Sequence, residues 1–254
     1  MDQKKEEREK EIKKNNFNIV IKEIAQIRLL GLWIFLIPLI AVNTCLLISV
    51  NYEIFEGTFF IVDQIGRSNF TFPYLDGSLS ISRASRTFPQ YLIFKPGMII
   101  TAILLCFYWY KNNILINHFS NIVSKKNTFM IFGILSAILL IIHSILLGLE
   151  TDIKIFKLLR RVVLVGFIIF EITAQSLLIL NFYRLKNELK NYFNLSVLKI
   201  KTLLVSVLAS VAIISIPFLI KIGNVHFKHG LEWNYFLGVI LFYLLTNFFW
   251  KKNI

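Results

Sequence analysis

Three side chains that can exchange protons stand in or beside long apolar stretches of the sequence. His143 comes late in one stretch, Glu171 lies near the middle of the next, and Glu232 opens the last. An ionisable residue costs about 2.5 to 3.5 kcal/mol at the centre of a membrane helix and usually faces the interior of a bundle. Glu171 and Gln175 are four residues apart, which places them on one face of a helix. We expect an intramembrane polar cluster, with His143 as a partner if its helix is a neighbour.

Such a cluster could do either of two things. A buried base could move a proton, so His143 and Glu171 are the candidate catalytic residues. Alternatively, the cluster is an interhelical hydrogen bond that fixes packing and contributes about 0.6 to 2 kcal/mol. The sequence favours the packing role, because we find no Gly-rich phosphate loop, no GxSxG elbow and no other catalytic signature. It does not decide whether the protein is an enzyme.

A second group of candidate ligands precedes the last apolar stretch. His226, His229 and Glu232 are spaced by three and could present nitrogen and oxygen ligands on one helical face. Polar connectors often hold histidines without such a role, and no HExxH motif is present. Cys45 and Cys106 both lie inside apolar runs, so they indicate neither a disulfide framework nor a metal site. We therefore expect no metal and no cofactor.

The stretch FPYLDGSLSISRASRTFPQYLIFKPGM, residues 72–98, is polar in an apolar chain. Asp76 and Gly77 form a strong turn dipeptide. The serines from Ser78 to Ser82 alternate with Leu and Ile, which is the period of a short strand or extended segment. The pattern predicts serine hydroxyls along one face of this segment.

Two arginines, Arg83 and Arg86, follow these serines directly. Guanidinium groups and hydroxyls together can bind an anionic group such as a lipid phosphate. We predict a lipid-headgroup site formed by Asp76, Ser78, Arg83 and Arg86. The alternative is a polar turn whose arginines lie at the level of the headgroups.

Membrane helices must position all of these residues. The chain is 56% hydrophobic, and its mean hydropathy is +0.65, which one water-soluble domain could not hide without large exposed apolar patches. A helix needs about 20 mostly apolar residues to span a bilayer. We predict an all-α polytopic membrane protein with six transmembrane helices at Leu29–Val50, Lys95–Tyr110, Phe129–Leu149, Val162–Tyr183, Thr202–Ile220 and Tyr235–Trp250. The second span is short and needs residues 88–94, or a thin local bilayer, to cross.

The predicted domain organisation is a tail at residues 1–28 and a six-helix transmembrane domain at 29–254. The tail is mostly charged, and its apolar residues from Phe17 to Ile27 recur at helical spacing. This pattern is typical of a helix on the membrane surface, or of an ordinary extension of the first span. The long outer loop between the first two spans, 51–94, is rich in aromatic residues, unlike a disordered segment. We expect it to fold over the outer end of the bundle.

The net charge of +13 does not indicate nucleic-acid binding, because the Lys and Arg residues flank the apolar runs. Their excess on the tail side predicts that both termini are cytoplasmic. The cations of residues 154–161 oppose this orientation. Of the two Asn-x-Ser/Thr sequons, only Asn69 would then be available for glycosylation, and Asn194 would not. The membrane would be the inner membrane in a bacterium and the endomembrane system in a eukaryote.

The polar stretch also carries a resemblance. FPYLDGSLS followed by RTFPQYLIFKPGMI is similar to the segment before the second helix in one membrane-protein superfamily. That superfamily comprises the damage-regulated autophagy modulators, the GPI-anchor remodelling proteins and the N-terminal domain of the calcofluor-white-hypersensitive cell-wall protein. The matching positions are Pro73, Tyr74, Asp76, Ser78, Glu232 and Trp233. The resemblance implies a polytopic protein that acts in lipid or lipid-anchor remodelling, or in membrane trafficking and signalling.

We therefore expect a membrane protein that recognises a lipid headgroup or a lipid-anchored partner and assists its remodelling or sorting. Its partners would be membrane lipids and a lipid-anchored or membrane protein, and not nucleic acid. The alternative is an intramembrane enzyme that transfers or hydrolyses an acyl chain, with His143 or Glu171 as its base. A small transporter is a third possibility, although the sequence shows no internal repeat of the kind that carriers use.

Overall fold

The computed structural model describes the chain except residues 1, 52, 54–57, 59–70, 120–126, 149–153, 221–222 and 252–254. Within the helices, the side chains of residues 2–16, 154, 157 and 216–220 are also outside the description. The helices of the described part are α1 (Asp2–Val50), α2 (Pro73–Asp76), α3 (Ile81–Ser85), α4 (Tyr91–Phe119), α5 (Thr128–Leu146), α6 (Lys154–Arg184), α7 (Lys186–Leu189), α8 (Leu195–Ile220) and α9 (Val225–Phe249).

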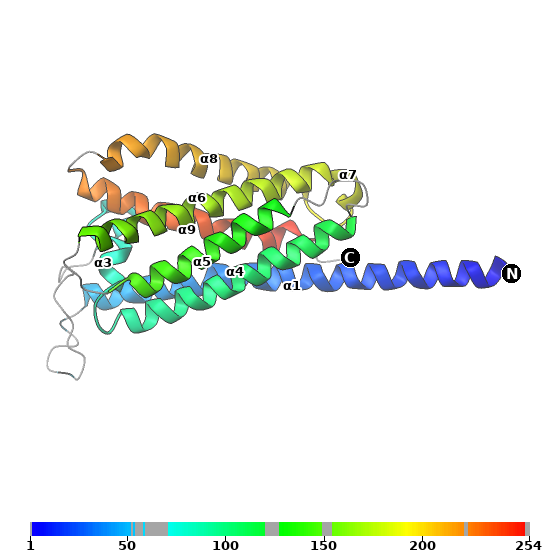
Figure 1. The fold of residues 1–254 in the computed structure, drawn as a ribbon, viewed down its shortest axis with the longest axis horizontal. Helices are drawn as coiled ribbons and strands as arrows, with labels where there is room; N and C mark the ends of the chain where they lie inside the picture. Colours follow the sequence, from blue (N-terminus) through cyan, green and yellow to red (C-terminus); the bar gives the residue numbers. More distant parts are fainter. Residues whose placement is uncertain are drawn as a thin grey trace.

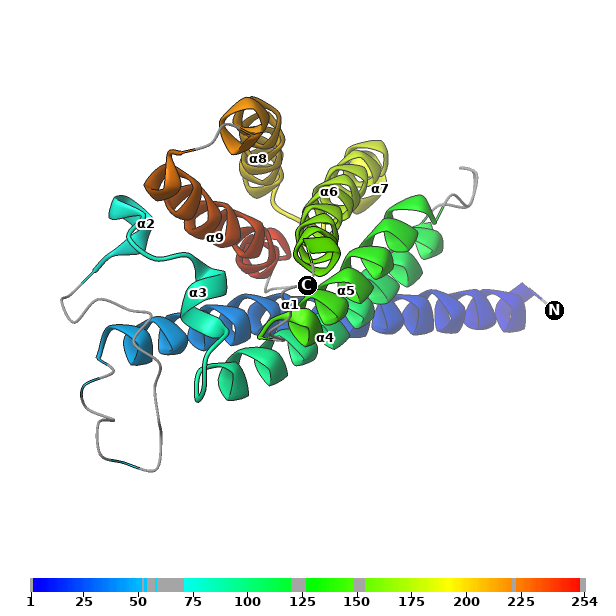
Figure 2. The ribbon, with the colours of Figure 1, turned by 60° about the vertical axis from the view of Figure 1, so that its left-hand side comes forward.

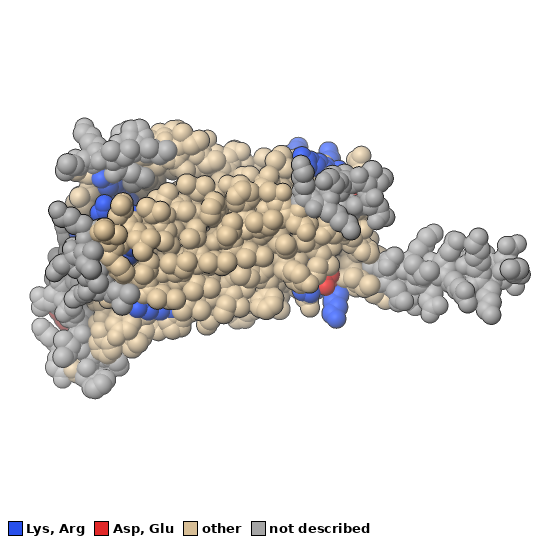
Figure 3. All heavy atoms as spheres, viewed as in Figure 1, with Lys and Arg blue, Asp and Glu red and all other residues tan. Residues whose placement is uncertain are grey.

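Five segments of these helices are long and apolar enough to cross a membrane. They are Phe17–Val50, Tyr91–Phe119, Thr128–Leu146, Leu158–Arg184 and Leu195–Ser215. On the face seen in Figure 3, Lys and Arg gather near the two ends of the bundle, and the broad band between them shows no charge. Such a band suits a hydrocarbon environment. The fold is therefore that of an integral, multi-pass, all-α membrane protein.

The second predicted span is longer in the structure than in the sequence prediction. α4 has 29 residues and needs no thinned bilayer to cross. The predicted run ended before Lys111, Asn112 and Asn113, but both asparagines are buried in the bundle, and the Asn112 side chain donates to the Tyr108 carbonyl at 2.8 Å. A buried polar residue that bonds its own helix, as Asn112 does, need not end a span. The bounds predicted from hydropathy, Lys95 to Tyr110, were therefore too narrow.

Six helices close a ring (Figures 1 and 2). α1 packs against α4, α4 against α5, α5 against α6, α6 against α8, α8 against α9, and α9 against α1. In Figure 1, α3 lies at one end, which we call the lid end, and Figure 2 shows α2 near it. The N-terminal part of α1 projects beyond the opposite, tail end. α9 completes the ring but is not among the five segments that are long and apolar enough to cross a membrane, and polar residues such as His226, Lys228 and Glu232 occupy its first turns.

Small residues let the helices approach closely. A Cβ atom on Gly97 of α4 would lie 2.8 Å from the Cβ of Ala41 on α1. Gly133 of α5 lies against the Trp109 ring of α4, with no room for a side chain. Membrane helices commonly pack through such small residues, because lipid offers no hydrophobic force to drive them together.

The apolar stripe that precedes the first predicted span belongs to α1. Val20, Ile24 and Ile27 are buried against the bundle, and Glu23 forms a 3.0 Å ion pair with Lys111 of α4. The stripe therefore faces neighbouring helices. The sequence left two alternatives for this stripe, a helix on the membrane surface and an extension of the first span. The structure shows the extension.

Residues 72–86, which we call the lid, contain α2 and α3 and lie at one end of the ring. The Ser80 side chain accepts from the Arg83 N–H at 3.2 Å and so caps the start of α3. The prediction of an extended segment through the serines was therefore wrong from Ile81 onward, because an N-cap serine starts a helix there. Of the predicted outer loop, the structure describes little before Thr71, and the loop ends at Gln90 because α4 begins at Tyr91. The predicted glycosylation site at Asn69 lies outside the described residues.

Candidate functional site

The lid is attached to α9 by two polar contacts far apart in sequence. The Glu232 carboxylate accepts from the Ser82 N–H at 3.3 Å, at the start of α3. The Trp233 indole donates to the Leu79 carbonyl at 2.7 Å and is fully buried. Backbone groups of the lid are thus satisfied by side chains of α9, which fixes where the lid lies.

Further contacts bind the first half of the lid. The Tyr74 ring lies 4.9 Å from the Trp233 ring, and the Tyr74 carbonyl accepts from the Asn234 side chain at 2.7 Å. Gly77 has φ +59 and lies directly against the His226 backbone, so a larger residue would not fit. The matching positions of the family resemblance, including Pro73, meet here in one contact region.

Of the four predicted headgroup ligands, Asp76 has local partners. The Asp76 carboxylate accepts from the N–H groups of Phe72 and Ser78, at 3.1 and 2.8 Å, and so stabilises the turn after α2. The Ser78 hydroxyl is a buried atom with no hydrogen-bond partner among the described residues. Arg83 lies exposed on α3 and Arg86 is half-buried just beyond it. The headgroup role of these four residues stays a prediction.

No group of three or more His, Cys, Asp or Glu side chains that could hold a metal exists among the described residues. The residues of the metal hypothesis have other contacts. His229 Nδ1 lies 3.0 Å from the Gly77 carbonyl, and Glu232 binds the Ser82 N–H. Burial lowers the pKa of His229 from its ordinary value of 6.5, and nearby Arg83 and His226 lower it further, whereas the contact with Gly77 opposes this shift.

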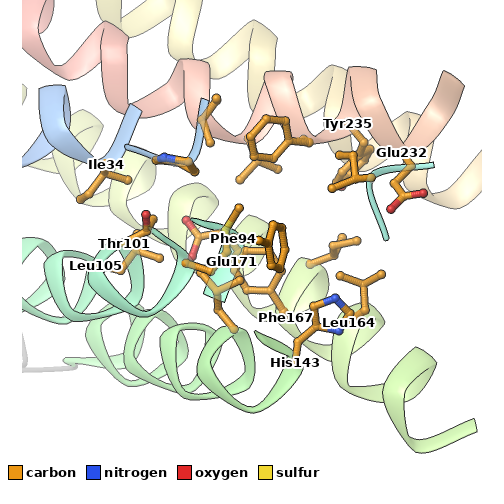
Figure 4. A pocket seen from close by; sticks show the side chains of 18 of the residues that line it. Ile34, Phe94, Thr101, Leu105, His143, Leu164, Phe167, Glu171, Glu232 and Tyr235 are labelled. Carbon is orange, nitrogen blue, oxygen red and sulfur yellow. The ribbon is translucent and has the colours of Figure 1, made fainter. Parts of the chain in front are cut away.

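A cavity of about 130 Å³ lies inside the ring beneath the lid. Its lining is mostly apolar and comes from every ring helix except α8, together with α3. Its deep end is at Glu171 and Tyr243, and its mouth, toward the lid, is at Ser82, His143, Leu164 and Glu232. The remaining lining residues are Ile34, Pro38, Ile81, Phe94, Met98, Thr101, Leu105, Leu140, Phe167, Ile168, Tyr235, Phe236, Val239 and Ile240. Figure 4 shows His143 on the α5 wall, across the cavity from Glu232 and Tyr235 of α9.

Glu171 is held at the deep end by three helices. Its carboxylate accepts from Ser136 of α5 at 2.6 Å and from Gln175 at 3.0 Å, and it also accepts from the hydroxyl of Tyr243 on α9. All four side chains are buried. The predicted shared face of Glu171 and Gln175 is therefore present, and the arrangement is that of an interhelical hydrogen-bond cluster.

His143 lies two turns from Ser136 along α5, toward the lid end, and it is not among the partners of Glu171. Its Nδ1 is a buried atom without a hydrogen-bond partner among the described residues. The side chain is 7% exposed and lines the cavity. The structure thus brings His143 and Glu171 to one cavity, but at different depths.

The sequence did not predict the burial of some polar residues. Lys201 was counted as a surface cation flanking the fifth span, yet it is 1% exposed. α8 begins at Leu195, so Lys201 lies nearly two turns inside the helix, where its Nζ donates to Thr246 at 2.9 Å. Ser136 and Tyr243 were also missed, because serine and tyrosine in an apolar run carry no signal without knowledge of the neighbouring helix.

No protein-family model, no curated protein and no solved structure matches this chain. The class of protein therefore follows from the fold alone. It is an integral multi-pass membrane protein with an apolar cavity under a lid.

Proposed function

We propose that the protein binds a membrane lipid, with part of an acyl chain in the cavity and the headgroup at its mouth beneath the lid. The observation that carries this proposal is the cavity itself. It is lined almost wholly by apolar side chains, and its ionisable groups stand at its two ends. A lipid has the same distribution, with an apolar chain that leads to a polar headgroup.

The size of the cavity supports this occupant. Apolar cavities of about 150 Å³ stay dry and bind small apolar molecules. A cavity of 130 Å³ is thus suited to one segment of a chain and not to a whole lipid. The rest of the lipid would lie between the lid and the bilayer. Because the lid is attached to α9, its position decides access to the mouth.

The finer topology belongs to the same proposal. α9 serves as the sixth span, from Tyr235 onward, so an even number of crossings places both termini on one side, the cytoplasm. The lid and the rest of the outer loop then face the opposite side. The membrane is the inner membrane in a bacterium or the endomembrane system in a eukaryote. With the family resemblance of the lid, this arrangement suits a protein that presents a lipid, or a lipid-anchored partner, for remodelling.

The test is to fill the cavity and measure the lipid that copurifies. Val239 is 6% exposed and lines the cavity, and Val207 of α8 is 49% exposed on the outside of the ring. Val239→Phe should lower the copurifying lipid, measured by mass spectrometry, by severalfold. Val207→Phe adds the same volume outside and should leave it unchanged. Equal lipid content in the two variants and the wild type would contradict the proposal.

A second candidate function is acyl transfer or hydrolysis in the same cavity. It is favoured by one observation, that Glu171 and His143 both line the cavity. Incubation with a lipid that carries a labelled ester, with and without Glu171→Gln and His143→Phe, tests it. Turnover that either substitution abolishes in a folded protein would support the enzyme. Lipid binding without turnover supports the binding protein.

A further inference from the structure

Two arginines stand at the mouth of the cavity on different elements. Leu164 of α6 lines the cavity, and Arg160 precedes it by four residues, one helical turn nearer the lid end on the same face. Ser82 lines the cavity from the lid, and Arg86 follows α3 four residues later. Both side chains are half-buried. Neither arginine is among the residues that line the cavity, so the two residues flank its mouth from outside.

The backbone holds Arg86 in this place. Gly148, which follows α5, has φ +83, and a Cβ atom there would lie 2.9 Å from the Arg86 carbonyl oxygen. The positive charge of Arg160 lies close enough to those of Arg86 and Arg161 to be repelled by each. None of the three forms an ion pair with a described residue. Like charges this close are unfavourable unless an anion lies among them. The guanidinium group of arginine can donate two parallel hydrogen bonds to the oxygens of a phosphate, which makes a phosphate a suitable anion.

His143 adds a second and independent requirement. The imidazole lines the cavity, and its Nδ1 is a buried atom without a hydrogen-bond partner among the described residues. With the ring proton on Nε2, Nδ1 is an acceptor. A buried acceptor without a donor is unfavourable. A hydroxyl group of the ligand, and not an ester carbonyl, would satisfy it.

We propose that the mouth of the cavity binds an anionic phospholipid that carries a free hydroxyl close to its phosphate. The phosphate lies between Arg86 and Arg160, the hydroxyl donates to His143 Nδ1, and a segment of acyl chain occupies the cavity. This inference rests on the proposed function and adds the chemical class of the lipid. A free phosphate ion would leave the cavity empty, and a choline headgroup would bring another cation toward the arginines.

Competition binding with native mass spectrometry tests the proposal on the whole chain in detergent. Phosphatidylglycerol carries the hydroxyl and the charge, phosphatidylmethanol carries only the charge, and phosphatidylcholine has no net charge. Wild type should prefer them in that order. Arg160→Gln and Arg86→Gln should each lower the preference for phosphatidylglycerol over phosphatidylcholine by about tenfold, which corresponds to about 1.4 kcal/mol and is near the low end for a charged hydrogen bond. His143→Phe should abolish the preference for phosphatidylglycerol over phosphatidylmethanol and leave the preference for charge.

Two variants control for folding and for charge. Arg160→Lys keeps the positive charge and should retain most of the preference. Arg184→Gln removes an exposed arginine at the tail end of the same helix and should change nothing. Lipid binding with no headgroup preference, or a preference that survives both Arg160→Gln and Arg86→Gln, would overturn this inference and leave the proposed function standing. Absence of any bound lipid in the wild type would overturn both. Displacement of phosphatidylglycerol by inorganic phosphate would overturn the inference in favour of a site for free phosphate.

Discussion

The Glu232 carboxylate accepts a hydrogen bond from the backbone N–H of Ser82, which lies 150 positions earlier in the chain, at 3.3 Å. This contact closes the lid over the cavity, because both residues belong to the cavity mouth. Burial raises the pKa of Glu232 to about 7 from its ordinary value of 4.5, although the N–H groups of Ser82 and Ile81 oppose this shift. The attachment of the lid is thus sensitive to pH in the neutral range.

The first prediction concerns the pH dependence of stability. The folded protein binds the Glu232 proton more tightly than the unfolded chain, so the stabilisation from the protonated carboxyl is lost as the pH rises toward and through 7. Glu232→Gln keeps an acceptor oxygen for Ser82 and removes the charge. We expect its thermal midpoint at pH 8 to exceed that of the wild type by about 2 to 4 °C and to match it near pH 5.

His229 faces the same lid, and its effect has the opposite sign. Because its folded-state pKa is lowered, its contribution is lost as the pH falls through its ordinary value of 6.5. The Glu232→Gln comparison should therefore be repeated in a His229→Gln background. A difference in thermal midpoint between Glu232→Gln and its parent protein that stays the same from pH 5 to pH 8 would contradict the role given to this carboxyl.

The second prediction concerns the attachment of the lid through Trp233. Trp233→Phe removes the indole N–H and leaves the buried Leu79 carbonyl without its donor. We expect a loss of about 1 to 2 kcal/mol in the free energy of unfolding, together with faster proteolysis within residues 72–86. Trp33 lies 46% exposed on α1, so Trp33→Phe is the matched control and should have little effect. Equal protease sensitivity in the two variants would mean that the lid does not depend on this bond.

The helices were predictable because hydropathy reports burial in lipid, and all five membrane-spanning segments overlap predicted spans. Glu171 and Gln175 were predicted on one face because that relationship depends only on helical spacing. Their partners Ser136 and Tyr243 were not, since neighbours in a ring depend on how whole helices pack. The same holds for Lys201, which hydropathy places at the edge of a span. The structure places it inside, because α8 begins earlier than the apolar run.

The lid shows the limit of local patterns. The turn at Asp76 and Gly77 was predictable, because both residues have strong local preferences. The helix after Ser80 was not, since alternating serines suit a strand equally well. Glu232 on α9 then stabilises the start of that helix, which is a contact that no local pattern contains. The metal hypothesis for His226, His229 and Glu232 arose for the same reason, because their partners lie in the distant lid.

The third prediction separates packing from catalysis at Glu171. Glu171→Leu leaves Ser136, Gln175 and Tyr243 without their common acceptor and should lower stability by roughly 1 to 3 kcal/mol. Glu171→Gln keeps one acceptor oxygen and should cost less. Thr173, on the exposed side of the same helix, bonds only its own helix at 2.7 Å, so Thr173→Val should be neutral. A Glu171→Leu protein as stable as the wild type would show that the cluster does not fix the packing.

The fourth prediction concerns Lys201, a buried cation whose Nζ lies 3.8 Å from the centroid of the Phe242 ring. The ring and the hydroxyl of Thr246 stabilise the charge by a few kcal/mol, but the loss of hydration costs several. Lys201→Met has similar volume and leaves Thr246 bonded to Tyr108 and to the Phe242 carbonyl. We therefore expect an unchanged or higher thermal midpoint. Lys199→Met, at an exposed position two residues earlier, controls for the loss of one charge. A fall of more than about 4 °C with Lys201→Met alone would mean that the ring and hydroxyl contacts outweigh desolvation.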